Sequence, residues 1–371
     1  NDDNHAKPFD GIIDDVLIFN STLSEQQIIA LYQNRTDLIV SQETNENDNW
    51  SVAATATDGT DASELSITDD LIILSLPPGP YLDCPDTYGN YTMTSDLFWG
   101  NSSMVCNQIT ISTGTILTLN STAVGRAVNI TANDLTIESG GVLSVVDMGF
   151  AKQEGPGYLG ANDNYASHYA GYGAGIIHST KKIYGSVTKP MDLGSGSDRE
   201  PGAGAVFLNI SNTLTVDGFI SANSSSGSYT RGTGGSIYIN TSVFSGSGNI
   251  SANSGACTNG YPTSSAGRIA IYYTTNSFTG FISATPGKAT TVANQGSAGT
   301  IYLKDVVNNY SNLTIWGNDL SSRKTYLNES ILDESTLNNL NVYGGADLDI
   351  DMNLSVLSDK LYVESGSVLN Q

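Results

Sequence analysis

The sequence predicts an all-β protein whose main part is a parallel β-helix, expected to be right-handed. Two kinds of strand recur at a spacing of 30 to 32 residues in the middle of the chain. Short runs with apolar residues at every second position flank this region and show no helical periodicity. An apolar period of two indicates strands, and strands that recur at one period indicate the coils of a β-helix.

The first recurring strand follows a glycine. Its pattern is a small residue, Gly, any residue, Val or Ile, any residue, and Ile or Leu, and the shared glycines lie 31, 32 and 32 residues apart. The segments are residues 203–208, 234–239, 266–271 and 298–303. If each coil lies over the next, one column should contain Val206, Ile237, Ile269 and Ile301. We expect the glycines to occupy corners with positive φ.

The second recurring strand follows each of the first three segments, at residues 218–223, 248–253 and 280–285. It predicts a second column, formed by Ile220, Ile250 and Ile282. About ten residues rich in Ser, Gly, Thr and Asn then precede the next coil, as in residues 224–233. These are predicted to be loops that leave the coil on one side.

Weaker alternating runs extend the predicted helix over residues 81–371. Upstream they are residues 109–111, 116–119, 128–130, 135–137 and 142–145, and downstream they are residues 313–315, 340–342, 348–350, 354–356 and 361–363. The alternative is a set of β-sandwiches, but sandwiches do not repeat their sequence at a constant period. We therefore favour the helix.

Composition and charge limit the partners. The 371 residues contain 15 Lys+Arg and 37 Asp+Glu, and the formal net charge of −22 argues against binding to nucleic acid or to an anionic membrane. No run of about 18 apolar residues occurs, so no membrane span is expected. No leading segment has a signal-peptide pattern, so a signal would have been removed or would lie upstream.

Three cysteines bear on the cellular compartment. Cys84 and Cys106 bracket a polar stretch rich in turn residues, and we expect them to form a disulfide, with Cys257 left over in a loop-like stretch. The alternative is three free thiols in a reducing compartment. A zinc site is not expected, because no CxxC occurs and the three histidines are scattered.

Asn-x-Ser/Thr sequons are about twice as frequent as chance gives, and they run the whole length of the chain. The asparagines are Asn20, Asn34, Asn49, Asn90, Asn101, Asn120, Asn129, Asn209, Asn223, Asn240, Asn249, Asn309, Asn312, Asn328 and Asn353. This excess predicts a heavily N-glycosylated, extracellular surface. Alternatively, Asn, Ser and Thr are simply the polar residues of solvent-facing turns.

Residues 149–202 interrupt the repeat. The stretch is rich in glycine and holds four tyrosines that we consider for contact with a glycan or a protein: Tyr158, Tyr165, Tyr169 and Tyr172. Tyrosines on glycine-rich loops are typical of contact surfaces. The alternative is that the loop packs its own tyrosines over the side of the helix.

Residues 8–36 carry the strings PFDGIIDDVLIF and LSEQQIIALY. They resemble the final strand and short helix of laminin-G/concanavalin-like jelly rolls, so residues 1–36 are expected to be the C-terminal part of such a domain. A whole jelly roll is several times longer, so either its body lies upstream or the strand completes a sheet in a neighbouring molecule. Calcium binding by Asp10, Asp14 and Asp15 is one interpretation, although such aspartates more often make turn and backbone hydrogen bonds.

Residues 37–80 form an Ig-like segment or a linker. The string WSVAATATDGT at residues 50–60 resembles late strands of Ig-like domains in bacterial and archaeal surface proteins. A second strand is expected at residues 69–76, and prolines end the segment.

The repeat strings GGSIYI, GFISAN and AGRIAIYY resemble glycine-rich β-helix segments of large secreted or surface-anchored prokaryotic proteins. That resemblance implies a bacterial or archaeal cell-surface, adhesive or filament-forming protein.

The repeat strands carry almost no Asp, Glu or His, so the acid clusters of β-helical polysaccharide lyases and hydrolases are missing and no enzymatic activity is expected. Asp347, Asp349 and Asp351 share one face of a strand, which could bind a cation but more often faces solvent. No cofactor is expected beyond the calcium considered above.

The sequence predicts an extracellular structural and adhesive protein, with a self-assembling filament subunit as one form of that role. Its partners would be neighbouring subunits and surface glycans. The alternatives are a glycan-binding β-helix module and a fragment of a monomeric adhesin.

Overall fold

A computed structural model of the protein describes residues 49–50, 53–54, 66–67, 71–72, 89–158, 160, 166–174, 183–317, 323–357 and 361–370. The chain divides into two compact units, Asn1–Pro77 and Pro78–Gln371. The structure is almost entirely β, with 43% strand and 2% helix, as the sequence predicts.

Among the described residues of the first unit, four short strands form two antiparallel pairs. Strand β1 (Asn49–Trp50) pairs with β4 (Leu71–Ile72), and β2 (Ala53–Ala54) pairs with β3 (Ser66–Ile67). Strands are thus found within both segments for which the sequence predicts them, 50–60 and 69–76. The predicted jelly-roll segment, residues 1–36, lies outside the described residues.

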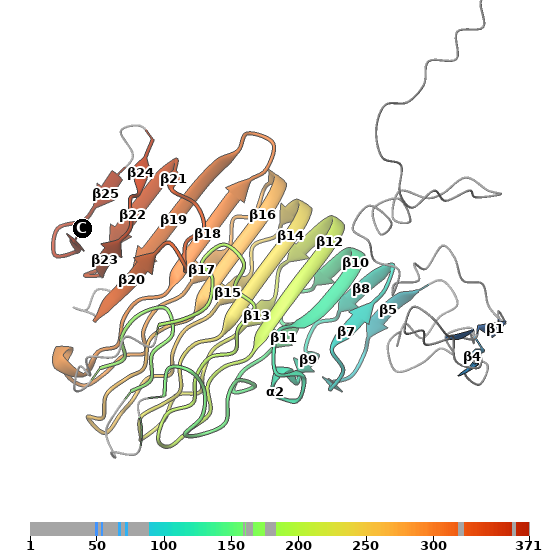
Figure 1. The fold of residues 1–371 in the computed structure, drawn as a ribbon, viewed down its shortest axis with the longest axis horizontal. Coiled ribbons are helices and arrows are strands. Elements are labelled where there is room, and N and C mark those ends of the chain that lie inside the picture. Colours follow the sequence, from blue (N-terminus) through green and yellow to red (C-terminus); the bar gives the residue numbers. More distant parts are fainter. Residues whose placement is uncertain are drawn as a thin grey trace, which may run out of the picture. The chain divides into compact units, whose positions relative to one another are not determined.

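The second unit is built on a main sheet whose strands follow one another in chain order (Figure 1). They are β5 (Asn90–Met93), β8 (Gln108–Ile111), β10 (Val128–Ile137), β12 (Ala205–Val216), β14 (Ser236–Ser245), β16 (Arg268–Asn276), β18 (Thr300–Asp305), β19 (Tyr310–Trp316), β22 (Asn339–Tyr343) and β25 (Leu361–Val363). Strand β7 (Ser103–Val105) lies before β8 in the chain and also pairs with β10. All neighbours are parallel except β18 and β19, which are antiparallel.

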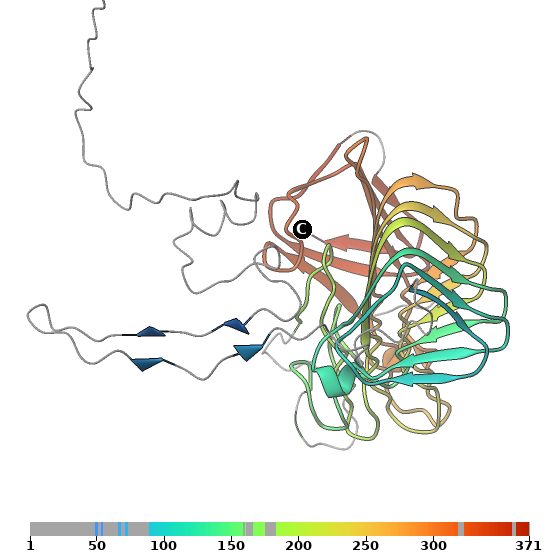
Figure 2. The ribbon, with the colours of Figure 1, turned by 90° about the vertical axis from the view of Figure 1, so that its right-hand side faces the viewer.

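A smaller parallel sheet accompanies the first half of the main sheet. Its strands are β6 (Leu97–Trp99), β9 (Ile116–Leu119), β11 (Val142–Ser144), β13 (Phe219–Ser221), β15 (Asn249–Ser251) and β17 (Phe281–Ser283). In the chain, each of these strands follows a strand of the main sheet, and the chain then returns to the main sheet to form its next strand. Figure 2 shows these successive segments, from cyan through orange, stacked behind one another. A short helix, α2 (Ser121–Val124), and a 3-10 turn, η2 (Val292–Asn294), lie in connections.

The predicted columns are confirmed. Val206 pairs with Ile237, Ile237 with Ile269, and Ile269 with Ile301 in successive strands of the main sheet. In the smaller sheet, Ile220 pairs with Ile250 and Ile250 with Ile282. These side chains belong to or pack on one continuous core between the two sheets, which we call the first core.

The repeated glycines do not have the positive φ that the sequence suggested. Gly235, Gly267 and Gly299 are absent from the residues with positive φ in the described part of the chain. Each instead lies against the backbone of the preceding coil. A Cβ on Gly267 would lie 2.0 Å from the oxygen of Gly235, and a Cβ on Gly235 would lie 1.8 Å from that of Gly204. Glycine recurs because neighbouring coils approach too closely for a side chain.

The stretches predicted to be loops form no regular strand, and they stack on one another from coil to coil with many of their residues buried. Asn223 Oδ1 accepts a hydrogen bond from Asn253 N (2.6 Å), and Asn253 Oδ1 accepts one from Thr285 N (2.7 Å). Ser224 Oγ likewise accepts from Gly255 N at 2.8 Å. The sequence did not predict this stacking, because small polar residues can satisfy buried backbone groups of the next coil as well as face water. We call residues 222–235, 252–267 and 284–299 the stacked loops.

After β18 the chain reverses, which a single continuous helix over 81–371 does not anticipate. Leu313 of β19 lies opposite Tyr302 of β18, on the face of the main sheet that points away from the first core. A second core forms on this face and includes Tyr302, Leu313, Leu327 and Leu348. It is closed by β20 (Lys324–Asn328), β23 (Asp347–Asp351) and β26 (Val368–Asn370), together with β21 (Thr336–Leu337) and β24 (Ser355–Val356).

Candidate functional surface

Residues 166–174 of the tyrosine-rich stretch are packed into the second unit, as the alternative interpretation expected. Tyr169 has no exposed surface and Tyr172 is 8% exposed. The backbone of residues 166–174 bonds on one side to the stacked loops, where Ser265 N donates to Ser167 O at 3.2 Å. On the other side, Tyr172 N donates to Lys324 O at 3.0 Å. Residues 166–174 therefore bridge the stacked loops to β20, and Tyr169 and Tyr172 are interior residues rather than surface contacts.

A buried arginine explains why Tyr169 is held in place. Arg268 is fully buried, and its guanidinium lies 5.4 Å from the centre of the Tyr169 ring. Arg268 Nη2 donates to Tyr184 O at 3.1 Å, and the Tyr169 hydroxyl lies 2.5 Å from Ser236 Oγ. Burial lowers the pKa of Arg268 and raises the pKa of Tyr169. The group is a buried packing centre.

Of the other two tyrosines considered for contact, Tyr165 lies outside the described residues. Tyr158 is partly exposed, and its hydroxyl donates to Asp198 Oδ1 at 2.7 Å. Desolvation and this hydrogen bond to a carboxylate raise the pKa of Tyr158 to about 12. Tyr158 is therefore a neutral phenol, fixed by Asp198, at the edge of the segment.

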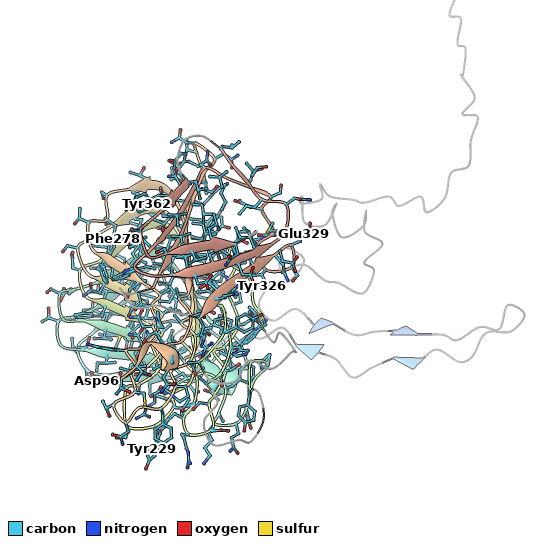
Figure 3. The ribbon with its side chains drawn as sticks, turned by 90° about the vertical axis from the view of Figure 1, so that its left-hand side faces the viewer. Asp96, Tyr229, Phe278, Tyr326, Glu329 and Tyr362 are labelled. Carbon is cyan, nitrogen blue, oxygen red and sulfur yellow. The ribbon has the colours of Figure 1, made fainter. Side chains whose placement is uncertain are left out.

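An exposed aromatic cluster lies on the stacked loops, at residues that the sequence pattern was not used to predict. Tyr229 is 46% exposed and stands 5.6 Å from the ring of Tyr261 on the next coil. The Arg199 guanidinium lies 5.4 Å from the Tyr229 ring centre. Figure 3 shows Tyr229 at the outer edge of the stacked loops. The two tyrosines are 32 residues apart, so their common position in the repeat was a signal for this cluster.

A shallow hollow of about 320 Å³ also opens on the stacked loops, between residues 256–258 and 288–290. Cys257 lies at its base, 2% exposed and free, with its sulfur 3.7 Å from Ser228 O. Thr258, Lys288 and Thr290 are exposed beside it. Aromatic faces, an arginine and nearby hydroxyl groups are the side chains that hold sugar rings or extended peptides.

The three aspartates on β23 each have a partner among the described residues. Asp349 is 3.5 Å from Lys324 Nζ, Asp351 accepts from the Tyr326 hydroxyl at 2.5 Å, and Asp347 accepts from Asn370 Nδ2 at 2.9 Å. No group of three or more His, Cys, Asp or Glu suited to a metal occurs within the part of the chain that the structure describes. Asp10, Asp14 and Asp15 lie outside that part.

The sequon asparagines whose exposure is known are all at least partly accessible. Asn90, Asn240, Asn309 and Asn353 are exposed, whereas the partly exposed ones are Asn101, Asn120, Asn129, Asn209, Asn223, Asn249, Asn312 and Asn328. Asn223 and Asn240 are less suited to carry a glycan, because Nδ2 of each already donates a hydrogen bond, to Ser251 Oγ at 2.9 Å and to Asn209 Oδ1 at 3.3 Å. Asn20 and Asn34 lie outside the described residues, and Asn49 is described only as part of β1.

Cys106 is disulfide-bonded and Cys257 is free. Cys84 lies outside the described residues, so its pairing with Cys106 stays a prediction. No helix among the described residues is long and apolar enough to cross a membrane.

Comparisons with protein-family models, with curated proteins and with solved structures find no match.

Proposed function

We propose that residues 81–371 form a parallel β-helix interrupted by one antiparallel reversal between β18 and β19, and that the protein is an extracellular structural and adhesive component of a cell surface. The observation that carries this proposal is the coil-to-coil register, in which equivalent residues of the repeat pair directly over at least four coils. Such stacking makes a stiff scaffold whose surface is set by the outward-facing positions. No catalytic role is part of the proposal.

Two further features support an extracellular site. None of the sequon asparagines with known exposure is buried, so each can be reached from solvent. The disulfide at Cys106 is the second feature, because disulfides persist in oxidising compartments. In this setting, neighbouring copies of the chain and surface glycans are the proposed partners, and a filament subunit is one form of the role.

The test is to isolate the protein from its native source, to map its glycopeptides by mass spectrometry and to examine it by electron microscopy. We expect sugar on several sequons and elongated particles, which join into filaments if the protein is a filament subunit. A compact, unglycosylated protein recovered from the cell interior would contradict the proposal. A glycosylated but strictly monomeric particle would reject the filament form and favour a monomeric adhesin.

A second candidate function is glycan binding by the Tyr229 cluster. It is favoured by the exposed ring of Tyr229, its neighbour Tyr261 and the guanidinium of Arg199. On a glycan array, Tyr229→Ala should weaken binding roughly tenfold, since loss of one stacking ring costs about 1–2 kcal/mol. Tyr310→Ala on β19, away from the stacked loops, is the control. Equal binding by the two variants would exclude this cluster.

A further inference from the structure

The outer face of the smaller sheet carries a stripe of apolar side chains along the coil axis. Pairing between neighbouring strands aligns Ile116 with Val142, Val142 with Phe219, Phe219 with Asn249, and Asn249 with Phe281. We call these five residues the outer stripe. Three of them are large exposed hydrophobic residues: Ile116 (39%), Phe219 (44%) and Phe281 (51%).

The neighbouring outward column of the same sheet is apolar only at its first position. It aligns Phe98, Thr118, Ser144, Ser221, Ser251 and Ser283. Along each strand a residue of the first core, such as Leu117 or Leu143, lies between the two columns, so both columns face away from that core. After Phe98, which is 60% exposed, that column consists of hydroxyl-bearing residues. The outer stripe instead exposes the rings of Phe219 and Phe281, and the Phe281 ring also meets Trp316 edge-on, with the ring centres 5.5 Å apart.

The single polar member of the outer stripe is Asn249, and it is the asparagine of the sequon Asn249-Ile250-Ser251. It stands between Phe219 and Phe281, about 4.8 Å along the sheet from each, the usual spacing of paired strands. Its side chain is partly exposed and makes no hydrogen bond to another described residue, in contrast to Asn223, whose Nδ2 is engaged. The Asn249 amide is thus free for modification.

We propose that Asn249 carries an N-linked glycan whose first sugar ring packs on the rings of Phe219 and Phe281. A pyranose has one face of C–H groups, which suits the negative face of an aromatic ring, while its hydroxyl groups remain in water. Covering the two rings in this way removes apolar surface from solvent. The glycan is the occupant of the outer stripe, and it excludes a flat protein partner from this face.

This inference rests on the proposed extracellular, glycosylated state, and the first measurement separates the two. Intact glycopeptides of the native protein are mapped by mass spectrometry, and we expect Asn249 to be occupied. If no sequon carries sugar, the proposed function fails together with the inference. If other sequons are occupied and Asn249 is not, only the inference is overturned.

The second measurement tests the packing in protein made by a host that glycosylates the native sequons. Hydroxyl-radical footprinting reports the exposure of Phe219 and Phe281 in the wild type and in Asn249→Gln, which keeps an amide but cannot be modified. We expect both rings to react roughly twofold faster in Asn249→Gln, because one face of each ring is uncovered. Asn353→Gln removes another exposed sequon and is the matched control; it should leave both rates unchanged.

A double-variant cycle guards against an indirect effect on folding. Asn249→Gln should lower Tm in the wild-type background by about 1–3 °C, and by less when Phe219 and Phe281 are both replaced by Ser. Occupancy of Asn249 with unchanged ring reactivity would overturn the packing. So would an equal loss of Tm in both backgrounds.

Discussion

Arg268 and Tyr169 show how a single buried pair connects distant parts of the second unit. Arg268 belongs to a repeat strand, whereas Tyr169 belongs to the segment that interrupts the repeat. A fully buried guanidinium is costly unless polar atoms and an aromatic face surround it. Tyr184 O, Thr300 Oγ1 and the Tyr169 ring provide that surrounding.

Tyr169→Phe should therefore reduce stability at neutral pH. The variant keeps the ring over Arg268 but loses the hydroxyl that contacts Ser236 Oγ at 2.5 Å and Asp192 O at 3.3 Å. We expect a loss of about 1 kcal/mol in the free energy of unfolding, because the polar atoms of Ser236 and Asp192 each keep another partner. Urea denaturation of the two proteins measures it, and an unchanged midpoint would contradict the role given to the hydroxyl.

The pH dependence follows from the same residue. Burial raises the pKa of Tyr169 above that of the unfolded chain. Below about pH 10 the phenol is protonated in both states and its contribution is complete. Above that pH the unfolded chain releases the proton first, so stability should fall by about 1.4 kcal/mol per pH unit for this group. Tyr169→Phe should show a shallower alkaline loss. Identical slopes for the two proteins would show that Tyr169 does not titrate as described.

At the scale of single elements, the glycine before each main-sheet strand fixes the distance between coils. Gly267→Ala would place a methyl group 2.0 Å from Gly235 O, a backbone atom that cannot move without its strand. We expect a loss of about 1–3 kcal/mol or more in the free energy of unfolding.

Gly100→Ala is the matched control for that experiment. No atom lies within 4 Å of a Cβ built on Gly100, and its φ is not positive. It should change stability by less than about 0.5 kcal/mol. Thermal unfolding of both variants compares them, and similar Tm values would mean that the close approach of coils is not limiting.

The strands themselves could be predicted from the sequence, because alternation and a constant period are local signals. The runs around Ile109, Ile116, Leu313, Leu340 and Leu348 are all strands in the structure. The role of the repeated glycines could not be predicted, since a positive φ and a close approach both select glycine. Only the distance to the preceding coil separates the two causes.

At the scale of the whole second unit, the main sheet is shared by two cores. Ile269 faces the first core and Leu340 faces the second, and both are buried. Because both cores pack on one hydrogen-bonded sheet, neither should melt without the other.

Ile269→Ala and Leu340→Ala test this coupling. Each should lower the free energy of unfolding of the second unit by about 2–5 kcal/mol, the usual cost of such a deletion in a core. Calorimetry should show a single transition for that unit in both variants. A separate early transition in Leu340→Ala alone would show that the second core unfolds independently.

The sequence could not predict where the tyrosine segment packs or where the chain reverses. Tyr169 is buried by contacts with residues far away in the sequence, such as Ser236 and Arg268, and no local pattern encodes those contacts. The sequence does contain a signal for the reversal. The glycine repeat stops after Gly299, and Asp305 Oδ1 accepts hydrogen bonds from the amides of Val307 and Asn308, a turn signal directly after a strand.

The reversal between β18 and β19 also bears on the handedness with which the coils after β19 wind. After the reversal, the strands run in the opposite direction, but successive coils still advance in the same direction along the sheet. This change alone would invert the handedness with which the chain winds. Closing the later coils over the opposite side of the sheet mirrors the winding a second time. The two inversions cancel, so the chain traces an S in cross-section and winds with the same sense in both lobes. The strong preference of parallel crossovers for one sense, met in about 98% of cases, can thus be satisfied throughout.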